Sequence, residues 1–208
     1  MHLLSAQAGE IQQEGEAIDL GQSPADILFL SAAGTELAAF ANAADAQQFD
    51  QLRLANTMRI SHNFSVDLWL EQTATKAKLI VVRLLGGRAY WTYGTDQLSA
   101  LCHDEGIQLA LLPGDANPDP DLKSRSNIDG DFYDALHALF VAGGQSNIDQ
   151  ALKAMRGIVD GATKLPTPMQ TPKAGIYSPE LGVVEKLDSQ QLADRPVAPI
   201  IFYKALLD

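Results

Sequence analysis

The stretch LIVVRLLGGRAYWTYG, residues 79–94, joins an apolar run, interrupted only by Arg83, to two glycines, a second arginine and three aromatic side chains. The run from Leu79 to Leu85 is short and rich in β-branched residues, which predicts a strand that is buried on both faces. Gly86 and Gly87 then end the strand. Strands of this kind are typical of parallel sheets covered by helices on both sides, so this stretch sets the prediction of the fold.

Other apolar runs along the chain alternate with segments that have helical spacing. Three further strands are predicted: His2–Ser5, Asp26–Leu30 and Ile107–Leu112. Helices are predicted behind caps at Thr35 and Thr95, over Ser65–Ala74, and in two patterns that end at Gly143 and Gly161. This alternation predicts an α/β fold, Rossmann-like or flavodoxin-like, with a parallel sheet and helices on both of its faces.

The composition changes after residue 162. Residues 163–180 hold four prolines, which exclude a long helix and predict an extended connector. The last segment contains the apolar run IIFY, residues 200–203, a strand that either joins the earlier sheet or begins another domain. We therefore divide the chain into an α/β head domain (1–162), a Pro-rich connector (163–180) and the truncated start of a second domain (181–208).

Charge and composition exclude several classes of function. The 208 residues carry a net charge of −11, which argues against binding to nucleic acid or to anionic membranes. The start of the chain lacks the features of a signal peptide, and no apolar run approaches the roughly 18 residues of a membrane span. Cys102 is the single cysteine and lies on the apolar face of a predicted helix, so neither a disulfide nor a thiolate zinc site is expected. We expect a cytoplasmic protein.

One acidic loop imitates a metal site. Asp115, Asn117 and Asp119 follow the first half of an EF-hand pattern, but Pro120 occupies the place of the turn glycine and Ser126 that of the closing glutamate. The four histidines of the chain show no i, i+4 pairing. We therefore expect a solvated loop and no metal site, and the catalytic residues stay unknown.

The turn of residues 86–94 is the strongest candidate for a functional site. It follows a predicted parallel strand, which places it at the carboxyl edge of the sheet, where open α/β sheets bind ligands. Glycines permit close backbone approach, arginines bind carboxylates, and aromatic rings stack on planar ligands. The candidate substrate-binding or interface residues are Arg83, Gly86, Gly87, Arg88, Tyr90, Trp91 and Tyr93.

Two interpretations of this turn stay open. It forms a pocket for a large planar ligand with acidic side chains, which would also supply an anion to Arg83 inside its apolar run. Alternatively, the aromatic rings pack on a neighbouring domain or beneath the loop, and Arg88 pairs with Asp96. The residue types alone name no reaction.

A family resemblance is carried by segments that occur in order along nearly the whole chain: MHLLSAQAGEI, VVRLLGGRAYWTYG, LLPGD, VAGG, AGIYSPE and RPVAPIIFYKALL. Together they resemble the amino-terminal part of the large subunit of aerobic cobaltochelatase, which is itself similar to the large subunit of magnesium chelatase. The most specific element is LGG-x-x-YW-x-YG, Leu85–Gly94. Thr92 departs from this pattern, in which proline is usual, and Ser178 stands where histidine is common.

The resemblance implies an ATP-dependent ligase that inserts Co²⁺ into hydrogenobyrinic acid a,c-diamide, a corrin-ring precursor, in cobalamin biosynthesis. It also implies two partner subunits: an AAA+ ATPase, which uses ATP with Mg²⁺, and an integrin-like metal-binding subunit. The large subunits of the family are several times longer than 208 residues. We therefore expect a fragment that binds no cofactor, lacks the metal-insertion site, and either docks on the remainder of the large subunit or caps its pocket.

Two other functions stay open. One is a stand-alone flavodoxin-like protein that binds a nucleotide or a flavin at the same strand ends. Against it, the segment SAAGTE, residues 31–36, contains neither of the glycine-rich phosphate-binding patterns. The other is a protein-interaction module that binds no small ligand.

Overall fold

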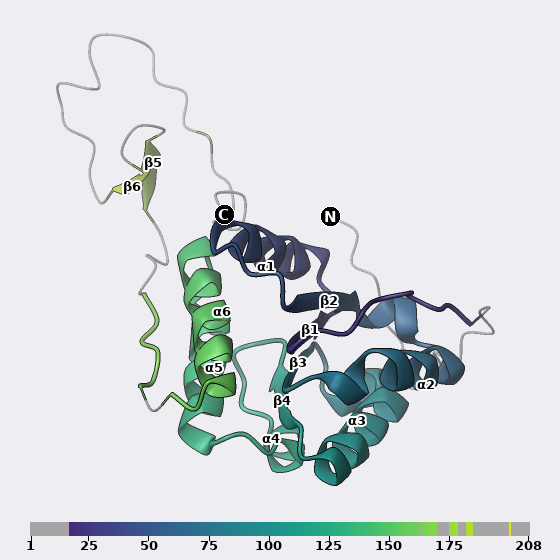
Figure 1. Ribbon diagram of the computed structural model, residues 1–208. Helices are drawn as coiled ribbons and strands as arrows, with labels where there is room; N and C mark the ends of the chain where they lie inside the picture. The colour runs from purple at the N-terminus through teal and green to yellow at the C-terminus, as the bar shows by residue number, and fades with distance from the viewer. Residues whose placement is uncertain (1–16, 163, 170–174, 179–181, 185–199, 201–208) are drawn as a thin grey trace, which may run out of the picture.

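The central element of the fold is a parallel sheet of four strands (Figure 1). The computed structural model describes residues 17–162, 164–169, 175–178, 182–184 and 200. The strands are β1 (Ile27–Ser31), β2 (Leu52–Asn56), β3 (Leu79–Leu84) and β4 (Gln108–Pro113). Their order is β2-β1-β3-β4, with every neighbouring pair parallel.

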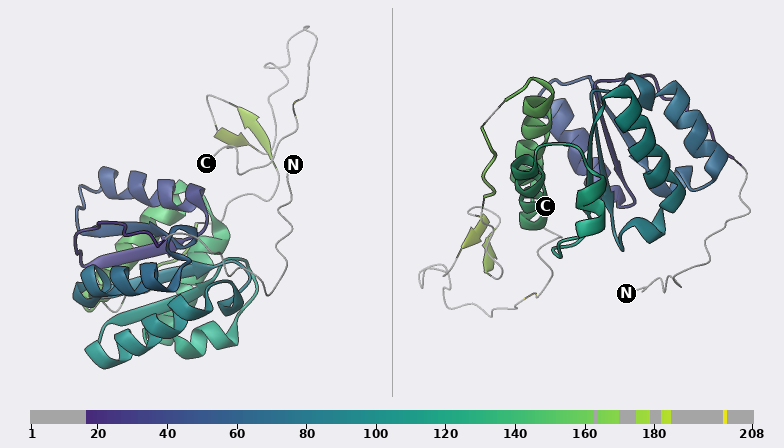
Figure 2. Two further views of the ribbon diagram at one scale, coloured as in Figure 1. Left: turned by 90° about the vertical axis from the view of Figure 1, so that its right-hand side faces the viewer. Right: turned by 90° about the horizontal axis from the view of Figure 1, so that it is seen from below.

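Helices cover both faces of this sheet, as the right-hand view of Figure 2 shows. One face packs against α1 (Gly34–Ala46), α5 (Gly130–Ala142) and α6 (Gln145–Val159). The other packs against α2 (Asn63–Gln72), α3 (Thr92–Glu105) and the short α4 (Pro120–Arg125). Single 3₁₀ turns follow β2 (η1, Thr57–Ile60), α2 (η2, Ala74–Lys76) and β3 (η3, Arg88–Tyr90). The α/β class and the parallel sheet predicted from the sequence are confirmed.

Burial on both faces explains why β3 is apolar at every position except Arg83. Leu79 and Val81 belong to the core beneath α1, α5 and α6, whereas Ile80, Val82 and Leu84 belong to the core beneath α2 and α3. All five side chains are at most 3 % exposed. Alternate residues of a strand point to opposite faces, so only a strand between two helical layers needs apolar residues at every position.

Two elements differ from the sequence prediction. The sequence LRLAN of β2 is not predicted as a strand, because it is short, lies at the edge of the sheet, and mixes polar with apolar residues. The predicted acidic loop contains α4, whose first turn is capped by the side chain of Asp119 (3.1 Å to the amide of Leu122) and begins at Pro120. Leu122 is fully buried, and its packing stabilises this helix.

Both predicted threonine caps are wrong. Helix α1 begins at Gly34, and its N-cap residue Ala33 makes no side-chain hydrogen bond. Thr95 lies inside α3, where its hydroxyl donates to the carbonyl of Trp91 at 2.7 Å. Helix α3 ends at Gly106, whose φ of 70° lies in the left-handed region that glycine favours.

The segment after α6 is held to that helix by one buried amide. Asn147, which is fully buried, accepts a hydrogen bond from the amide of Met169 (2.8 Å) and donates one to its carbonyl (3.0 Å). Beyond it, β5 (Ile176–Ser178) and β6 (Gly182–Val184) form an antiparallel pair. The predicted strand His2–Ser5 and residues 201–203 of the terminal strand lie outside the described residues.

None of the helices in the described ranges has the length and apolar character that a bilayer crossing requires.

Candidate functional site

The loops that follow the four strands meet at the carboxyl edge of the sheet, because all four strands run in the same direction. The loop after β1 leads to α1 on one face, and the turn after β3 leads to α3 on the opposite face. Since β1 and β3 are neighbours, the chain changes face between them. Open α/β sheets form their ligand crevices at such a point.

The glycines of the turn after β3 are required by its shape. Gly86 and Gly87 have φ angles of 86° and 75°, which residues with a Cβ rarely adopt. A Cβ at Gly86 would lie 2.1 Å from the ring of Tyr90, so this ring lies against the glycine. A Cβ at Gly114 in the next loop would lie 2.6 Å from the Cα of Leu85, and the Gly114 amide donates to the carbonyl of Leu84 at 2.9 Å. The loops after β3 and β4 therefore pack directly on each other.

Arg88 is already paired inside the chain. Its Nε and Nη2 donate to the two carboxylate oxygens of Asp96 at 2.9 and 2.5 Å, and Arg125 donates to the same carboxylate at 3.3 Å. The hydrogen bond raises the pKa of Arg88 and lowers the pKa of Asp96. The predicted Arg88–Asp96 pair is thus present, and it occupies the donors that a ligand carboxylate would use.

The three aromatic residues of the turn have different environments. Trp91 is 6 % exposed, and its Nε1 donates to the carbonyl of Ile60 at 3.0 Å, which fixes the turn to η1 after β2. Tyr93 is half-buried and donates its hydroxyl to Asp67 of α2 at 2.8 Å, which raises its pKa. Tyr90 is 47 % exposed. Tyr90 is therefore the most exposed of the three, although one side of its ring lies against Gly86.

Arg83 points away from the turn, into the core beneath α1 and α5. It is 6 % exposed and forms an ion pair with Glu36, the acidic residue in the first turn of α1. Its guanidinium lies 4.6 Å from the centroid of the Phe140 ring, and Nη2 donates to the carbonyl of Pro113 at 3.3 Å. Burial lowers the pKa of Arg83, whereas the negative charges of Glu36 and Asp115 raise it.

Glu36 was not among the predicted site residues. It also accepts a hydrogen bond from the hydroxyl of Ser31 at 2.6 Å, so the ends of β1 and β3 and the start of α1 share one polar cluster. Within the described residues, Nε of Arg83 has no hydrogen-bond partner. The sequence does contain a pattern that indicates this ion pair. A carboxylate lies in the first helical turn after one strand, and an arginine lies near the end of another strand.

A shallow cleft of about 150 Å³ lies between the turn after β3 and the loop after β4. Its polar lining is acidic. Asp115 accepts hydrogen bonds from the backbone and side chain of Asn117 (2.9 and 3.2 Å), which lower its pKa, and Asp119 caps α4. The remaining lining residues are Leu84, Gly86, Gly87, Pro113 and Pro118.

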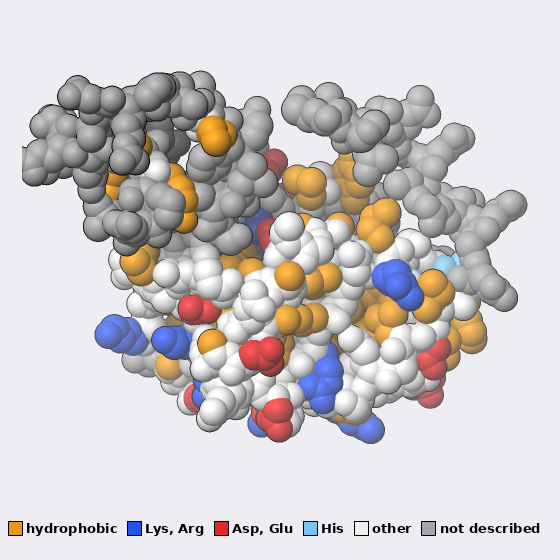
Figure 3. All heavy atoms as spheres, turned by 90° about the horizontal axis from the view of Figure 1, so that it is seen from above, with side chains coloured by type: hydrophobic (Ala, Val, Ile, Leu, Met, Phe, Trp, Pro, Cys, Tyr) orange, Lys and Arg blue, Asp and Glu red, His pale blue; other side chains and the backbone are white. Residues whose placement is uncertain are grey.

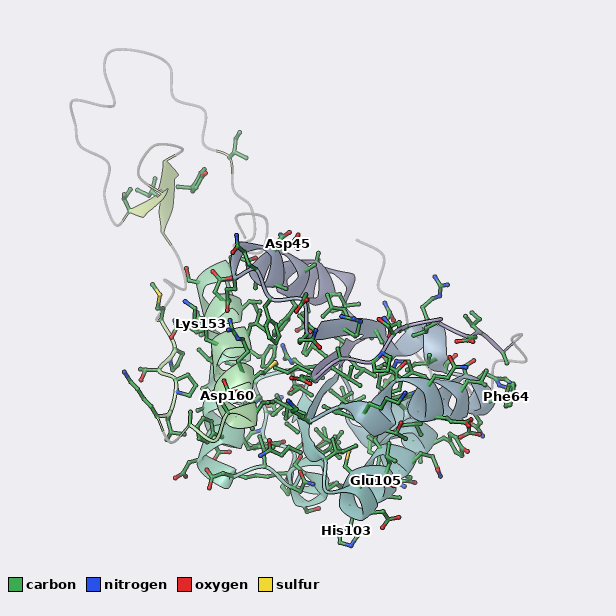
Figure 4. All side chains as sticks on the ribbon, in the orientation of Figure 1. Asp45, Phe64, His103, Glu105, Lys153 and Asp160 are labelled. Atoms are coloured by element: carbon green, nitrogen blue, oxygen red, sulfur yellow. The ribbon has the colours of Figure 1, made fainter. Side chains whose placement is uncertain are left out.

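Neither the histidines nor the cysteine forms a reactive centre in the described part of the chain. His137 contacts the carbonyl of Asp115 through Nε2 at 2.9 Å. Cys102 is 1 % exposed, and burial raises the pKa of its thiol to about 12. Across the described ranges, no three His, Cys, Asp or Glu side chains are arranged to hold a metal ion. Figure 4 shows His103 and Glu105 together at the end of α3, far from Phe64 at the start of α2.

The fold and the site define a Rossmann-like α/β domain whose carboxyl-edge turn is held by its own ion pairs. No family model matches the chain. Its whole length is 42 % identical to the aerobic cobaltochelatase subunit CobN of Sinorhizobium sp. and 32 % identical to the subunit of that name in Pseudomonas aeruginosa. The chain is therefore homologous to part of the large subunit of aerobic cobaltochelatase, which confirms the resemblance seen in the sequence.

The chain spans 17 % of the length of each of these curated relatives. Among solved structures, the catalytic subunit of cobaltochelatase from Mycobacterium tuberculosis is similar, with a TM-score of 0.57 and 23 % identity. That match covers 74 % of this chain and 12 % of the other. At this identity the structural match shows the fold alone.

Proposed function

We propose that this chain is the amino-terminal region of the large subunit of an aerobic cobaltochelatase. The observation that carries the proposal is 42 % identity over the entire chain to a subunit of that name. The complete enzyme would insert Co²⁺ into hydrogenobyrinic acid a,c-diamide, with an AAA+ ATPase and an integrin-like subunit as partners. Such a complex draws on the ATP pool of the cytoplasm, where we place it.

Within that enzyme we propose a docking role for this region. The substrate carries carboxylates, and a site for it would offer unpaired cations. Here Arg83 is paired with Glu36 and Arg88 with Asp96, while the neighbouring cleft is lined by Asp115. Acidic groups in the cleft repel an anionic macrocycle. The charges of the turn therefore favour contact with protein over contact with substrate.

The test uses the intact large subunit with both partner subunits, Co²⁺, Mg²⁺, ATP and the diamide. Insertion is followed by the change in the visible spectrum of the corrin ring, with reactions that lack ATP or one partner as controls. We expect ATP-dependent insertion, because the chain matches CobN along its whole length. A subunit that inserts no cobalt with active partners present refutes the proposed function.

A second measurement separates docking from substrate binding. The Tyr90→Ala variant of the intact subunit removes the exposed ring of the turn, and for a docking role we expect the KM for the diamide to stay within about twofold of the parent value. A rise of about tenfold or more in that KM, with kcat unchanged, would instead assign the turn to the substrate.

A further inference from the structure

Exposed hydrophobic side chains are concentrated at the carboxyl edge of the sheet. Within residues 17–162, six large hydrophobic side chains are exposed, and four of them lie on the loops and helix starts that follow β2 and β3. These four are Met58 (55 %), Phe64 (55 %), Leu85 (65 %) and Tyr90 (47 %), here called the edge patch. Single exposed hydrophobic residues are normal, but a group on one edge is typical of an interaction site.

The edge patch is held in place by the contacts of the turn. The Nε1 of Trp91 donates to the carbonyl of Ile60, which joins the η1 segment carrying Met58 to the turn carrying Leu85 and Tyr90. The ring of Tyr90 lies against Gly86, where no side chain would fit. Because the backbone segments that carry Met58, Leu85 and Tyr90 are already joined, a partner that binds here does not have to order these loops.

The opposite edge of the sheet has a different surface. Its loops expose charged side chains, and none of the exposed large hydrophobic residues in the described head lies there. Examples are Asp50 before β2, Lys78 before β3, and Asp104 and Glu105 at the end of α3. The large exposed hydrophobic side chains of the edge patch therefore distinguish the carboxyl edge from the opposite edge.

A cation without an ion-pair partner among the described residues lies beside the edge patch. Arg59 is exposed next to Met58 and forms no ion pair with any described residue, although the chain as a whole carries a net charge of −11. Figure 3 shows hydrophobic side chains around a Lys or Arg side chain at the right of that view, and Figure 4 places Phe64 at the outer end of α2. A partner would therefore present an apolar surface with a carboxylate opposite Arg59.

We infer that the edge patch is the surface on which the remainder of the large subunit docks. This inference rests on the proposed function. The curated relatives are about six times as long as this chain, which spans 17 % of each, so most of such a subunit lies outside the head. The patch meets the remainder through Met58, Phe64, Leu85 and Tyr90, with Arg59 paired to an acidic residue there.

The experiment compares two methionines of equal exposure. Met58 in the patch and Met169 outside it are both 55 % exposed in this structure. Each is replaced by cysteine in the intact large subunit, and labelling of the introduced thiol by a maleimide is followed by peptide mass spectrometry. We expect the thiol of the Met58→Cys variant to react about tenfold more slowly than that of Met169→Cys, because docking covers only the first. Leu85→Cys repeats the comparison.

Equal labelling rates at positions 58 and 169 would overturn the inference. Protection at position 58 that disappears when residues 2–16 are deleted would assign the patch to the start of this chain and would also overturn it. The two proposals fail separately: a subunit that inserts cobalt but labels equally at both positions keeps the proposed function and loses only the docking surface.

Discussion

Arg83 shows how a strand buried on both faces accommodates a charge. An ion removed from water without a partner costs several kcal/mol, and Arg83 is 6 % exposed. Glu36 supplies the opposite charge, Ser31 holds the Glu36 carboxylate, and the Phe140 ring lies 4.6 Å from the guanidinium. Removal of one partner therefore lowers the free energy of unfolding by more than the intact pair contributes to it.

Replacement of Glu36 tests this pair. Glu36→Gln leaves Arg83 charged and buried, so we expect the free energy of unfolding to fall by about 3 kcal/mol, measured by urea denaturation. The double variant Arg83→Met with Glu36→Gln should lose less than the sum of the single losses. As a control, Asp26→Asn removes the exposed pair between Asp26 and Lys78 and should cost less than about 1 kcal/mol. Equal costs for Glu36→Gln and Asp26→Asn would contradict the interpretation.

Cys102 gives a pH prediction. Burial raises the pKa of its thiol from 9.0 to about 12, so above pH 9 the unfolded chain loses this proton while the folded chain keeps it. The contribution of Cys102 to stability is therefore complete below pH 9 and is lost as the pH rises from 9 toward 12. Between pH 9 and 11 we expect the parent to lose about 1 kcal/mol per pH unit more than Cys102→Ala, by urea denaturation. Parallel pH profiles for the two proteins would argue against this.

At the scale of elements, strands were easier to predict than helix starts. The strands β1, β3 and β4 follow from apolar runs, because burial on both faces leaves a strong local pattern. The start of α3 has no such pattern: Trp91 precedes the helix, and its side chain is fixed by a carbonyl 31 residues earlier. A threonine four residues later looks like a cap in the sequence but lies inside the helix.

The turn after β3 can be tested through Gly86. Gly86→Ala adds a Cβ where the Tyr90 ring lies, whereas Gly106→Ala adds one where no atom lies within 4 Å; both glycines have positive φ. We expect Gly106→Ala to cost about 1 kcal/mol through the backbone alone. Gly86→Ala should cost about 0.5–1 kcal/mol less in a Tyr90→Ala background than in the parent, by thermal or urea unfolding. An unchanged cost in that background would show that the ring does not lie on the glycine in solution.

At the scale of the whole molecule, the arginines of the candidate site at the carboxyl edge are paired internally, whereas Arg59 on the loop after β2 has no ion-pair partner among the described residues. The two arginines of the candidate site have carboxylate partners, Glu36 and Asp96, and the cleft beside them is acidic. The hydrophobic side chains of the edge patch, on the same edge, are 47–65 % exposed in the described structure. The edge is thus better suited to bind an apolar protein surface than an anionic ring.

A fluorescence titration of this chain tests whether it binds the anionic ring. Trp69 and Trp91 are 2 % and 6 % exposed, and their Nε1 atoms donate to Gln22 and Ile60. We expect the diamide, added to high micromolar concentration, to leave their emission unchanged after correction for its own absorbance with N-acetyltryptophanamide. Saturable quenching beyond that correction would show that this region binds the macrocycle.

The α/β class, three strands of the sheet and the position of the aromatic turn follow from local patterns in the chain, because they depend on apolar runs and glycines. Which groups of that turn are available to a ligand or a partner depends on contacts with distant parts of the chain. Arg83 meets Glu36 across 47 residues only because β1 and β3 are neighbours, and Trp91 is buried while Tyr90 is exposed because of a carbonyl on another loop. Charge pairing and burial depend on contacts between distant segments, which no local pattern records.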